Sequence, residues 1–447
     1  MAALDGDLFG PQAMPDLAGA KLDNQTLLRA VRALSLYRDP KSKALRRVNY
    51  AALDVEELGS VYESLLDYRP VVTRQGKSEK AKVKSDGNEG AEPFAFDLFT
   101  FDLASGSERK TTGSYYTRPE LVHELIKSAL EPVLAERLAV AERDPRELRQ
   151  RHADALTEAD RSLSPELQAK VRAILSLRVV DPAAGSGHFL LAAARRLGRE
   201  LARVRSGEDS PAPSEYRRAV RDVIARCIYA VDLNPLAVDL CKVALWLESL
   251  EPGKPLSFLD SKVRWGNSLV GATRELVARG IPDEAYKPVT GDDKAAAGAF
   301  RTRNKKEREA KQRGQLSLGL EFAAPELAAS PSAGARALNA MPDDSVTAVR
   351  AKAQQYEQLR AGAYSDMVRL NLWTAAFFTP LADAGDVAVP TSGSLDEWSE
   401  RPSQYNLMLG RAFELAAQVG FFHWELEFPE LFPGGEAGGF DVVLGNP

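Results

Sequence analysis

Residues 177–194 read LRVVDPAAGSGHFLLAAA, and this stretch decides the fold. Its first part, residues 177–180, is short and apolar, as expected of a buried strand. A loop of small residues follows at 181–187, and good helix formers begin at His188. The order of strand, small-residue loop and helix predicts the first unit of an open α/β sheet.

The loop at 181–187 favours a small nucleoside-like cofactor. Glycine lets the backbone approach a ligand closely, and free amides at a helix start attract carboxylate or phosphate groups. A dinucleotide site requires a third glycine where Leu190 stands, and a triphosphate loop requires a Gly-Lys-Ser or Gly-Lys-Thr sequence that this loop lacks. The pattern therefore argues against NAD and ATP as its ligands.

Three further strand candidates also end on polar side chains. Residues 228–231 lead to Asp232, residues 263–265 lead to Asn267 and Ser268, and the apolar run at 440–445 closes on Asn446. An acid at the end of the second strand is placed to accept both hydroxyls of a ribose. Any one of these residues alone is explained by helix capping or a turn. Four strand ends in order predict a binding edge at the carboxyl ends of a parallel sheet.

A segment upstream of the loop predicts a capped helix. Thr117 and Glu120 have the spacing of a capping box. The apolar positions that follow have helical periodicity and predict a buried face. They are Leu121, Val122, Leu125, Ile126, Ala129 and Leu130.

With these motifs, the chain resembles the S-adenosylmethionine-dependent DNA methyltransferases that modify the amino group of adenine. The resemblance implies an α/β fold with a Rossmann-like class I methyltransferase sheet, an N-terminal helical region and a helical insert. It implies S-adenosylmethionine as the cofactor, bound at the loop by Asp181, Ala183, Gly185 and Gly187, at the ribose by Asp232 and Leu233, at the adenine by Asn267 and Ser268, and at the methionine part by Tyr116 and Thr117. Asn446 and Pro447 are similar to the start of the catalytic Asn-Pro-Pro-Tyr motif.

The implied reaction requires a base that has left the duplex. Stacked adenine cannot present its amino group to a cofactor, so the base is rotated out at a cost of roughly a few kcal/mol. The Asn446 side chain and the Pro447 carbonyl would accept hydrogen bonds from the amino group and hold its nitrogen in line with the sulfonium methyl. The resemblance implies neither a metal nor a covalent intermediate.

The order of the motifs resembles one group of these enzymes, whose target-recognition domain is C-terminal. Within it, the residues 109–117 and the long segment between the third and fourth strands are similar to the large enzymes of bacterial phage defence. These include fused restriction-methylases and the methylases of the BREX and DISARM systems. The resemblance implies double-stranded DNA as the partner and a role in restriction-modification or antiviral defence.

The family pattern continues beyond Pro447 with a second proline and an aromatic residue that stacks on the base. On this ground the chain is expected to be a truncated or split gene product with little or no methyltransferase activity alone. Its expected partners are a separate C-terminal half or other subunits of a defence system.

Composition shifts predict five segments. They are an N-terminal helical region at 1–73 with a helix at 53–66, a linker at 74–95, a methyltransferase core at 96–285, a low-complexity basic and alanine-rich insert at 286–345, and a helical segment with the catalytic strand at 346–447. The basic run from Arg301 to Arg313 could contact phosphates. A solvated helix or a disordered loop is the favoured interpretation because no aromatic residues are interleaved. The aromatic run at 421–429 is interpreted as core packing.

The overall composition is compatible with these expectations and decides little. The net charge of -5 over 447 residues does not indicate nucleic-acid binding. Cys227 and Cys241 form neither a zinc motif nor a disulfide framework, so a reducing cytoplasm is expected. No apolar run reaches membrane-spanning length, and the N-terminus has no signal-peptide pattern.

Three alternatives remain open at this level. A protein-glutamine methyltransferase also uses an Asn-Pro-Pro-Tyr motif, although it is usually more compact. A noncatalytic cofactor-binding subunit of a defence complex would need only the first half of the site. A nuclease centre at Asp102 and residues 108–110 has suitable residue types but no room for a core of its own.

Overall fold

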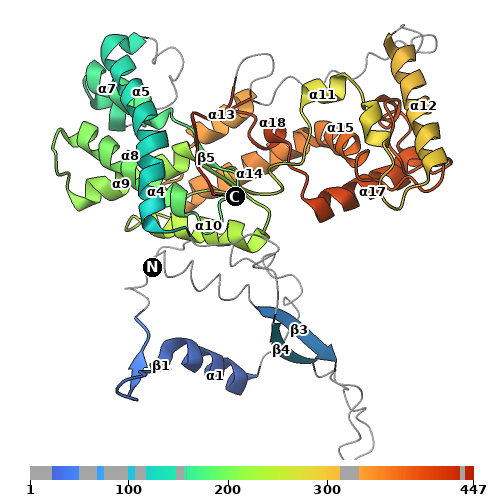
Figure 1. Cartoon of the computed structure of the whole chain (residues 1–447). Coiled ribbons are helices and arrows are strands. Elements are labelled where there is room, and N and C mark those ends of the chain that lie inside the picture. The colour runs from blue at the N-terminus through green and yellow to red at the C-terminus, as the bar shows by residue number, and fades with distance from the viewer. Residues whose placement is uncertain are drawn as a thin grey trace, which may run out of the picture. The chain divides into compact units, whose positions relative to one another are not determined.

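The structure is a computed structural model that describes residues 23–49, 68–74, 99–105, 117–146, 156–157, 159–312, 332–432 and 438–446 (Figure 1). The chain divides into two compact units. The smaller unit comprises Ala30–Tyr116, and the larger unit contains the remaining residues.

The smaller unit contains two antiparallel hairpins. Strand β1 (Leu36–Arg38) pairs with β2 (Leu45–Arg47), and β3 (Tyr68–Arg74) pairs with β4 (Phe99–Ser105). Helix α1 (Asn24–Ser35) leads into β1. The strands β1, β2 and β3 lie in the region expected to be helical. The three-residue strands β1 and β2 give too short a pattern to be recognised from the sequence. The expected helix at 53–66 and all of the expected linker except residue 74 lie outside the described residues.

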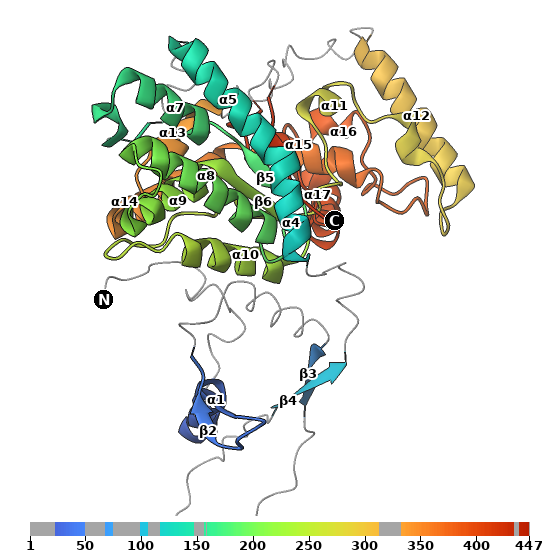
Figure 2. The same ribbon diagram turned by 60° about the vertical axis from the view of Figure 1, so that its left-hand side comes forward.

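The larger unit is built on a four-stranded parallel sheet. The strands are β5 (Val179–Asp181), β6 (Ile228–Asp232), β7 (Val263–Trp265) and β8 (Val442–Val443), in the order β7-β6-β5-β8. Each expected strand is confirmed, and β8 pairs with β5 although they are far apart in sequence. The four carboxyl ends therefore lie along one edge, which Figures 1 and 2 show beside the chain end marked C.

Helices cover the sheet because its strands are apolar on both faces. Helix α8 (His188–Ser206) follows the small-residue loop and packs against α9 (Pro213–Cys227), which lies between β5 and β6 in the chain. Their contact is close, since a Cβ on Gly198 would lie 2.5 Å from the Val220 side chain. The other helices around this part of the sheet are α4 (Pro119–Leu125), the π-helix η4 (Ile126–Leu130), α5 (Glu131–Arg143), the 3-10 helix η6 (Ala159–Ser162), α7 (Pro165–Leu175) and α10 (Pro235–Glu248).

An aromatic cluster positions β8. Phe422, Phe428 and Tyr229 are buried together, with Trp424 and Phe440 packed against them. The ring of Phe440 meets that of Tyr229 edge to face, with centroids 5.4 Å apart. The expected core-packing role of the segment 421–429, which includes α18 (Trp424–Glu427), is thereby confirmed.

Residues just before β8 are also fastened to β5. The Asp441 carboxylate forms an ion pair with Arg137 of α5 and accepts a hydrogen bond from the Arg178 amide at 2.8 Å. Together, the aromatic contacts and the two interactions of Asp441 fix the position in the sheet of β8, the strand that leads to Asn446.

A helical lobe lies between β7 and β8 in the sequence and has its own core of buried residues, including Ile281, Phe300 and Leu372. It contains α11 (Arg274–Ala278), the 3-10 helix η7 (Asp283–Tyr286), α12 (Lys294–Gln312), α15 (Tyr364–Ala375), α16 (Ser394–Glu397) and α17 (Pro402–Val419). Two further helices, α13 (Ser332–Ala340) and α14 (Val346–Gly362), pack on each other around Phe258 and Tyr356. The described helices include none long and apolar enough to cross a membrane.

A neutral histidine joins this lobe to the end of β7. His423 Nδ1 accepts a hydrogen bond from the Ala272 amide at 3.0 Å, so its Nε2–H donates to Asn371 Oδ1 at 2.9 Å. Burial lowers the pKa of His423 to about 4, which keeps the ring neutral near pH 7.

Candidate functional site

The carboxyl edge of the sheet brings four of the expected residues into one row. Asp181 ends β5 and Asp232 ends β6, while Asn267 follows β7 and Asn446 follows β8. Neighbouring strands lie about 4.8 Å apart, so the row from β7 to β8 spans roughly 14 Å. This edge is where open parallel sheets bind their ligands.

The loop after β5 owes its shape to two glycines. Gly185 and Gly187 have φ angles of 53° and 86°, in the left-handed region that favours glycine. A Cβ on Gly187 would lie 2.9 Å from the Cys241 sulfur of α10, so this glycine is required by packing. A Cβ on Gly185 would meet nothing within 4 Å. Gly185 therefore leaves open space in which a ligand can approach the backbone.

The loop amides are already hydrogen-bonded within the protein. Ala183 N–H donates to Asp181 Oδ1 at 3.0 Å, and Gly185 N–H donates to Asp232 Oδ2 at 2.8 Å. Ala184 and Gly187 donate to the carbonyls of Val231 and Ala184. The expectation that free amides here attract an anion is wrong for these four groups. What the loop offers a ligand is its shape and the carboxylates that hold it.

Asp232 connects β6 to this loop and to the start of α10. Besides the Gly185 amide, its carboxylate accepts the Asn234 amide at 2.8 Å. Each carboxylate oxygen can accept a second hydrogen bond, so both retain capacity for a pair of ligand hydroxyls. Burial raises the pKa of Asp232 above its ordinary value, while the two amides lower it. Next to it, half-exposed Leu233 offers an apolar surface, and its carbonyl accepts from Trp265 Nε1 at 2.8 Å.

Asp181 is the most deeply buried acid of the row. Its side chain is 1% exposed, and Oδ2 has no hydrogen-bond partner among the described residues. Burial raises the pKa of Asp181 to about 7, the Ala183 amide lowers it, and the nearby Asp232 raises it. A Cβ on Gly445 would lie 3.0 Å from Asp181 Oδ1, so the end of β8 closes directly on this carboxyl group.

We expect the Asp181 carboxyl to make stability fall as pH rises towards 7. Its pKa is about 7 in the folded protein against an ordinary value of 3.8, so between these values the folded state holds a proton that the unfolded chain has lost. Asp181→Asn removes this effect. Between about pH 5 and pH 7, the free energy of unfolding of the variant should rise relative to that of the parent by up to about 1.4 kcal/mol per pH unit. Above about pH 7 the difference should stay constant.

Urea unfolding at a series of pH values measures this difference, and Asp209→Ala, which removes a surface acid, provides the control. The prediction concerns how the difference in free energy of unfolding changes with pH. The size of the difference at any one pH is not informative, because the new buried amide can shift the stability by the same amount at every pH. A difference that is constant with pH would contradict the prediction.

Asn267 and Ser268 lie in a turn at the end of β7. Asn267 Oδ1 accepts the Leu269 amide at 3.1 Å, so its amide oxygen is partly used by the turn itself. The Ser268 carbonyl accepts from Trp424 Nε1 at 3.0 Å, and its side chain is partly exposed. Both residues reach the expected edge, but neither presents its full hydrogen-bonding capacity to a ligand.

Sequence reasoning missed the chain segment that lies beside this turn. Phe421 forms a parallel bridge with Asn267, and the Phe422 amide donates to the Val270 carbonyl at 2.8 Å. Two glycines make the contact possible. A Cβ on Gly266 would lie 2.6 Å from the Phe422 ring, and one on Gly420 would lie 3.2 Å from the Asn267 amide. Gly266 and Gly420 were the residues in the sequence that could have indicated this close contact.

Thr117 contacts the residue Asn446 after β8 instead of capping a helix. Helix α4 begins at Pro119 with Arg118 at its N-cap, and no side chain caps it. The expected capping box is therefore wrong, because the proline places the helix start one residue too far along for Thr117. Its Oγ1 instead accepts a long hydrogen bond, 3.5 Å, from the exposed side chain of Asn446.

The helical face that follows is confirmed in part. Val122, Ile126 and Leu130 are buried, whereas Leu121 is 60% exposed. Two expected site residues, Tyr116 and Pro447, lie outside the described residues.

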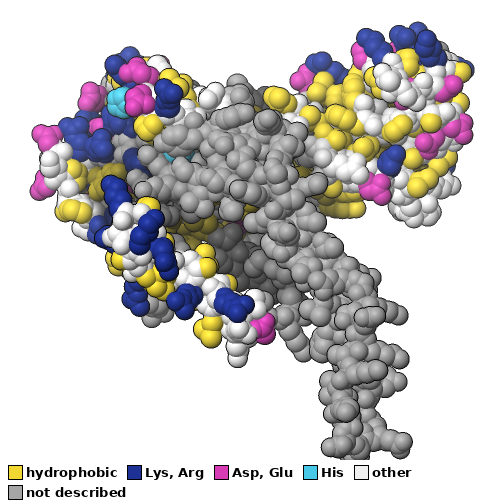
Figure 3. All heavy atoms as spheres, turned by 60° about the horizontal axis from the view of Figure 1, so that its bottom comes forward, with side chains coloured by type: hydrophobic (Ala, Val, Ile, Leu, Met, Phe, Trp, Pro, Cys, Tyr) yellow, Lys and Arg dark blue, Asp and Glu magenta, His cyan; other side chains and the backbone are white. Residues whose placement is uncertain are grey.

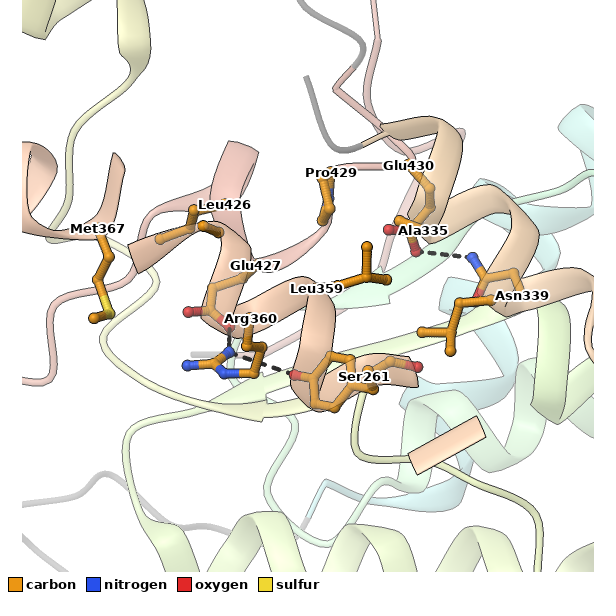
Figure 4. Close-up of a pocket in the computed structure, with 13 residues that line it drawn as sticks. Ser261, Ala335, Asn339, Leu359, Arg360, Met367, Leu426, Glu427, Pro429 and Glu430 are labelled. Atoms are coloured by element: carbon orange, nitrogen blue, oxygen red, sulfur yellow. Dashed lines mark hydrogen bonds and ion pairs between the residues drawn. The ribbon is translucent and has the colours of Figure 1, made fainter. Parts of the chain in front are cut away.

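A well-formed pocket lies away from this edge, between α13, α14 and α18 (Figure 4). Its apolar walls include Leu338, Leu359 and Leu426, and the ion pair of Arg360 with Glu427 lies on its lining. None of the expected site residues lines it. The part of the chain that the structure describes contains no group of three His, Cys, Asp or Glu side chains placed to hold a metal ion.

Comparisons with known proteins agree with this arrangement. Residues 226–447 match the family described as the Eco57I restriction-modification methylase. A protein of Methanocaldococcus jannaschii named "Putative type II restriction enzyme and methyltransferase" is 26% identical over 242 residues, which cover 50% of this chain and 20% of that protein. The chain therefore spans about a fifth of the length of this curated relative. No solved structure matches the chain significantly.

The matched half is thus similar to a restriction-modification methylase, and the parallel sheet is compatible with an α/β methyltransferase fold. The match contains Asp232, Asn267 and Asn446, whereas the loop at 181–187 lies before it.

Proposed function

We propose that this protein is an S-adenosylmethionine-dependent DNA methyltransferase that modifies the N6 amino group of a flipped adenine within a restriction-modification or phage-defence system. The observation that carries the proposal is the row of Asp181, Asp232, Asn267 and Asn446 along one sheet edge, of which the last three lie in the half matched by the methylase family. Double-stranded DNA is the proposed partner and the cytoplasm the proposed location.

The chemistry of the edge fits this cofactor. S-adenosylmethionine carries a nucleoside, a cationic sulfonium and an amino acid, and it supplies an electrophilic methyl group when bound. Asp232 would accept the ribose hydroxyls, and Asn267 with Ser268 would face the adenine next to the exposed Leu233. Two acids on neighbouring strands favour a cation, because Asp232 makes ionisation of Asp181 less favourable until positive charge arrives.

The remaining residues have roles at the methionine part and at the flipped base. Ala183, Gly185 and Gly187 would shape the loop around the cofactor, and Tyr116 with Thr117 would close over its methionine part. Asn446 would accept a hydrogen bond from the adenine amino group through its side-chain oxygen, and Pro447 would accept the second through its carbonyl. Thr117 supports this orientation, because it accepts from Asn446 Nδ2 and so leaves the amide oxygen for the base. Most of the rate would come from positioning.

Transfer of a labelled methyl group tests the proposal. The protein is incubated with duplex DNA and S-adenosylmethionine labelled on the methyl group, and the DNA is digested to nucleosides. Label in N6-methyl-2′-deoxyadenosine that is absent with Asn446→Ala, while calorimetry shows that this variant still binds the cofactor, would support the proposed activity and would show that the expectation of little activity alone is wrong.

The other outcomes separate the rival functions. Label in cytosine would contradict the adenine assignment, and label in protein would indicate a protein-glutamine methyltransferase. Cofactor binding without any transfer would agree with little activity of this chain alone and would favour a noncatalytic subunit over the proposed activity.

A further inference from the structure

Helix α12 concentrates positive charge in a chain that is acidic overall. Between Lys294 and Gln312 it carries seven lysine or arginine residues and two glutamates, a net charge of +5, against -5 for the whole chain. Figures 1 and 2 place α12 at the outer side of the helical lobe, away from β5. In Figure 3, dark-blue lysine and arginine side chains gather at the outer edge of that lobe.

One face of α12 is fixed on the lobe. Ala296, Ala297 and Phe300 are buried in the lobe's core, and Asn304 is fully buried beside them. Asn304 Nδ2 donates to the Ile281 carbonyl at 2.8 Å, and its Oδ1 accepts the Ser392 amide at 2.9 Å and the Ser392 hydroxyl at 2.8 Å. A buried amide with this many partners allows one rotation of the helix about its axis.

Some charges of α12 serve this attachment. Arg308 pairs with Asp283 at 3.0 Å, and Glu307 accepts the Gly393 amide at 2.8 Å. Arg303 is paired with Glu307 one turn away. The charges of Arg303, Glu307 and Arg308 are therefore paired within the lobe.

Three other cations face outward. Arg301, Lys305 and Lys306 are exposed. Among the described residues Arg301 and Lys306 have no ion pair, and the distance from Lys305 Nζ to the nearest carboxylate, on Glu309, is 4.0 Å. Arg301 and Lys306 are therefore not neutralised by any described residue, and Lys305 is paired only at long range.

The surface between these cations consists of small side chains. Ala295, Gly298, Ala299 and Thr302 are exposed on successive turns, and a shallow hollow lies over the last three of them. The hollow is also lined by Lys306 and by the paired Arg303 and Glu307. Small side chains let another macromolecule approach the helix closely, and the long side chains of the flanking cations can extend along that macromolecule. No aromatic or long apolar side chain interrupts this face, so it lacks the anchors typical of protein interfaces.

We propose that this outer face of α12 binds the phosphate backbone of duplex DNA, independently of base sequence. The inference rests on the proposed function for its choice of DNA as the polyanion. Fixed cations without base-reading side chains position a protein on a duplex and supply affinity that depends on salt. The helix thereby gives a chain of negative net charge a local surface for its substrate.

The salt dependence of DNA binding tests this role. The variant Arg301→Gln/Lys305→Gln/Lys306→Gln is compared with Arg199→Gln/Arg217→Gln/Arg218→Gln, which removes three exposed cations from α8 and α9. Binding of a labelled duplex of random sequence is followed by fluorescence anisotropy between about 50 and 200 mM salt. Log K, where K is the association constant, falls as log salt concentration rises. If the three cations contact three phosphates, the α12 variant should make this slope less steep by about 2.7, and the control should leave the slope unchanged.

Several outcomes would overturn the inference. Equal losses in both variants would mean a general charge effect, and an unchanged slope would mean that α12 does not touch DNA. Failure of the parent protein to bind duplex DNA at low salt, or equal competition by polyglutamate, would also exclude a DNA surface. Calorimetric titration with S-adenosylmethionine separates this question from the proposed function, because α12 variants should bind the cofactor as the parent does.

Discussion

Replacing Asp232 with alanine is expected to weaken S-adenosylmethionine binding at least about 100-fold in calorimetric titration. Two hydrogen bonds from ribose hydroxyls to a carboxylate are worth roughly 1.5–3 kcal/mol each, and about 1.4 kcal/mol corresponds to a factor of ten. The same change removes the acceptor of the Gly185 amide, so the loop loses its connection to β6 as well. Asp209→Ala, which removes an exposed acid, should bind as the parent does.

A modified ligand separates contact with the ribose from the shape of the loop. The parent protein should bind the 2′,3′-dideoxy analogue of S-adenosylhomocysteine much more weakly than S-adenosylhomocysteine itself. The Asp232→Ala variant should bind the two equally, because the group that distinguishes them is gone. Continued discrimination by the variant would place the ribose elsewhere.

A pair of glycine variants examines the same pocket independently. Gly185 and Gly207 both have left-handed backbone, with φ angles of 53° and 72°, and a Cβ on either meets nothing within 4 Å. Each glycine-to-alanine change should cost a similar stability, roughly 1–2 kcal/mol. Only Gly185→Ala should also weaken cofactor binding, because its methyl group enters the space beside the loop. Equal binding by both variants would mean that this space holds no ligand.

Replacing Glu427 with alanine is expected to destabilise the protein by about 3 kcal/mol in urea unfolding. Its carboxylate, 13% exposed, pairs with Arg264 of β7 at 2.7 Å and with Arg360 of α14 at 3.1 Å. Removing it leaves two guanidinium groups without their counter-ion. The expected cost is at the lower end for a buried pair because the side chain of Arg360 is 39% exposed.

The ion pair of Glu275 with Arg279 provides the control, because both side chains are mostly exposed and the two residues are four apart, in α11 and at its C-cap. Glu275→Ala should cost less than about 0.5 kcal/mol. Burial raises the pKa of Glu427, but Arg264 and Arg360 together lower it by more than burial raises it. The net shift of the pKa is therefore downward. Its stabilisation is therefore present at neutral pH and is lost as the pH falls below its ordinary value of 4.5. Equal costs for the two variants would show that burial adds nothing to this network.

The Glu427 network also bears on the candidate site. Arg264 is part of β7, and Asn267 lies three residues after Arg264 in the chain. Fixing β7 to α14 and α18 therefore fixes the turn that would face the cofactor's adenine. The neutral His423 acts at the same place by binding the Ala272 amide. The helices inserted between β7 and β8 thus support the sheet edge as well as carrying the basic face of α12.

The sequence predicted the parts of this site that depend on local pattern. The strands β5 to β8 and the helix that begins at His188 follow from apolar runs and good helix formers, which neighbouring residues decide. It failed at Thr117, where a capping spacing was present but Pro119 moved the helix start. It also failed for the loop amides, because their acceptors include Val231 and Asp232, about fifty residues away in the chain.

The sequence by itself determined the order of the strands β5 to β8 and the kind of residue at each of their ends, since these depend on glycine, proline and hydrophobic period within a few residues. Only the tertiary structure decided that β8 lies beside β5, that Gly445 closes on Asp181, and that burial raises the pKa of Asp181 to about 7. It also decided that Phe421 runs beside Asn267 and that Glu427 joins two arginines. Each of these properties comes from the packing of segments distant in sequence, and packing sets burial, charge proximity and the partners of every buried polar group.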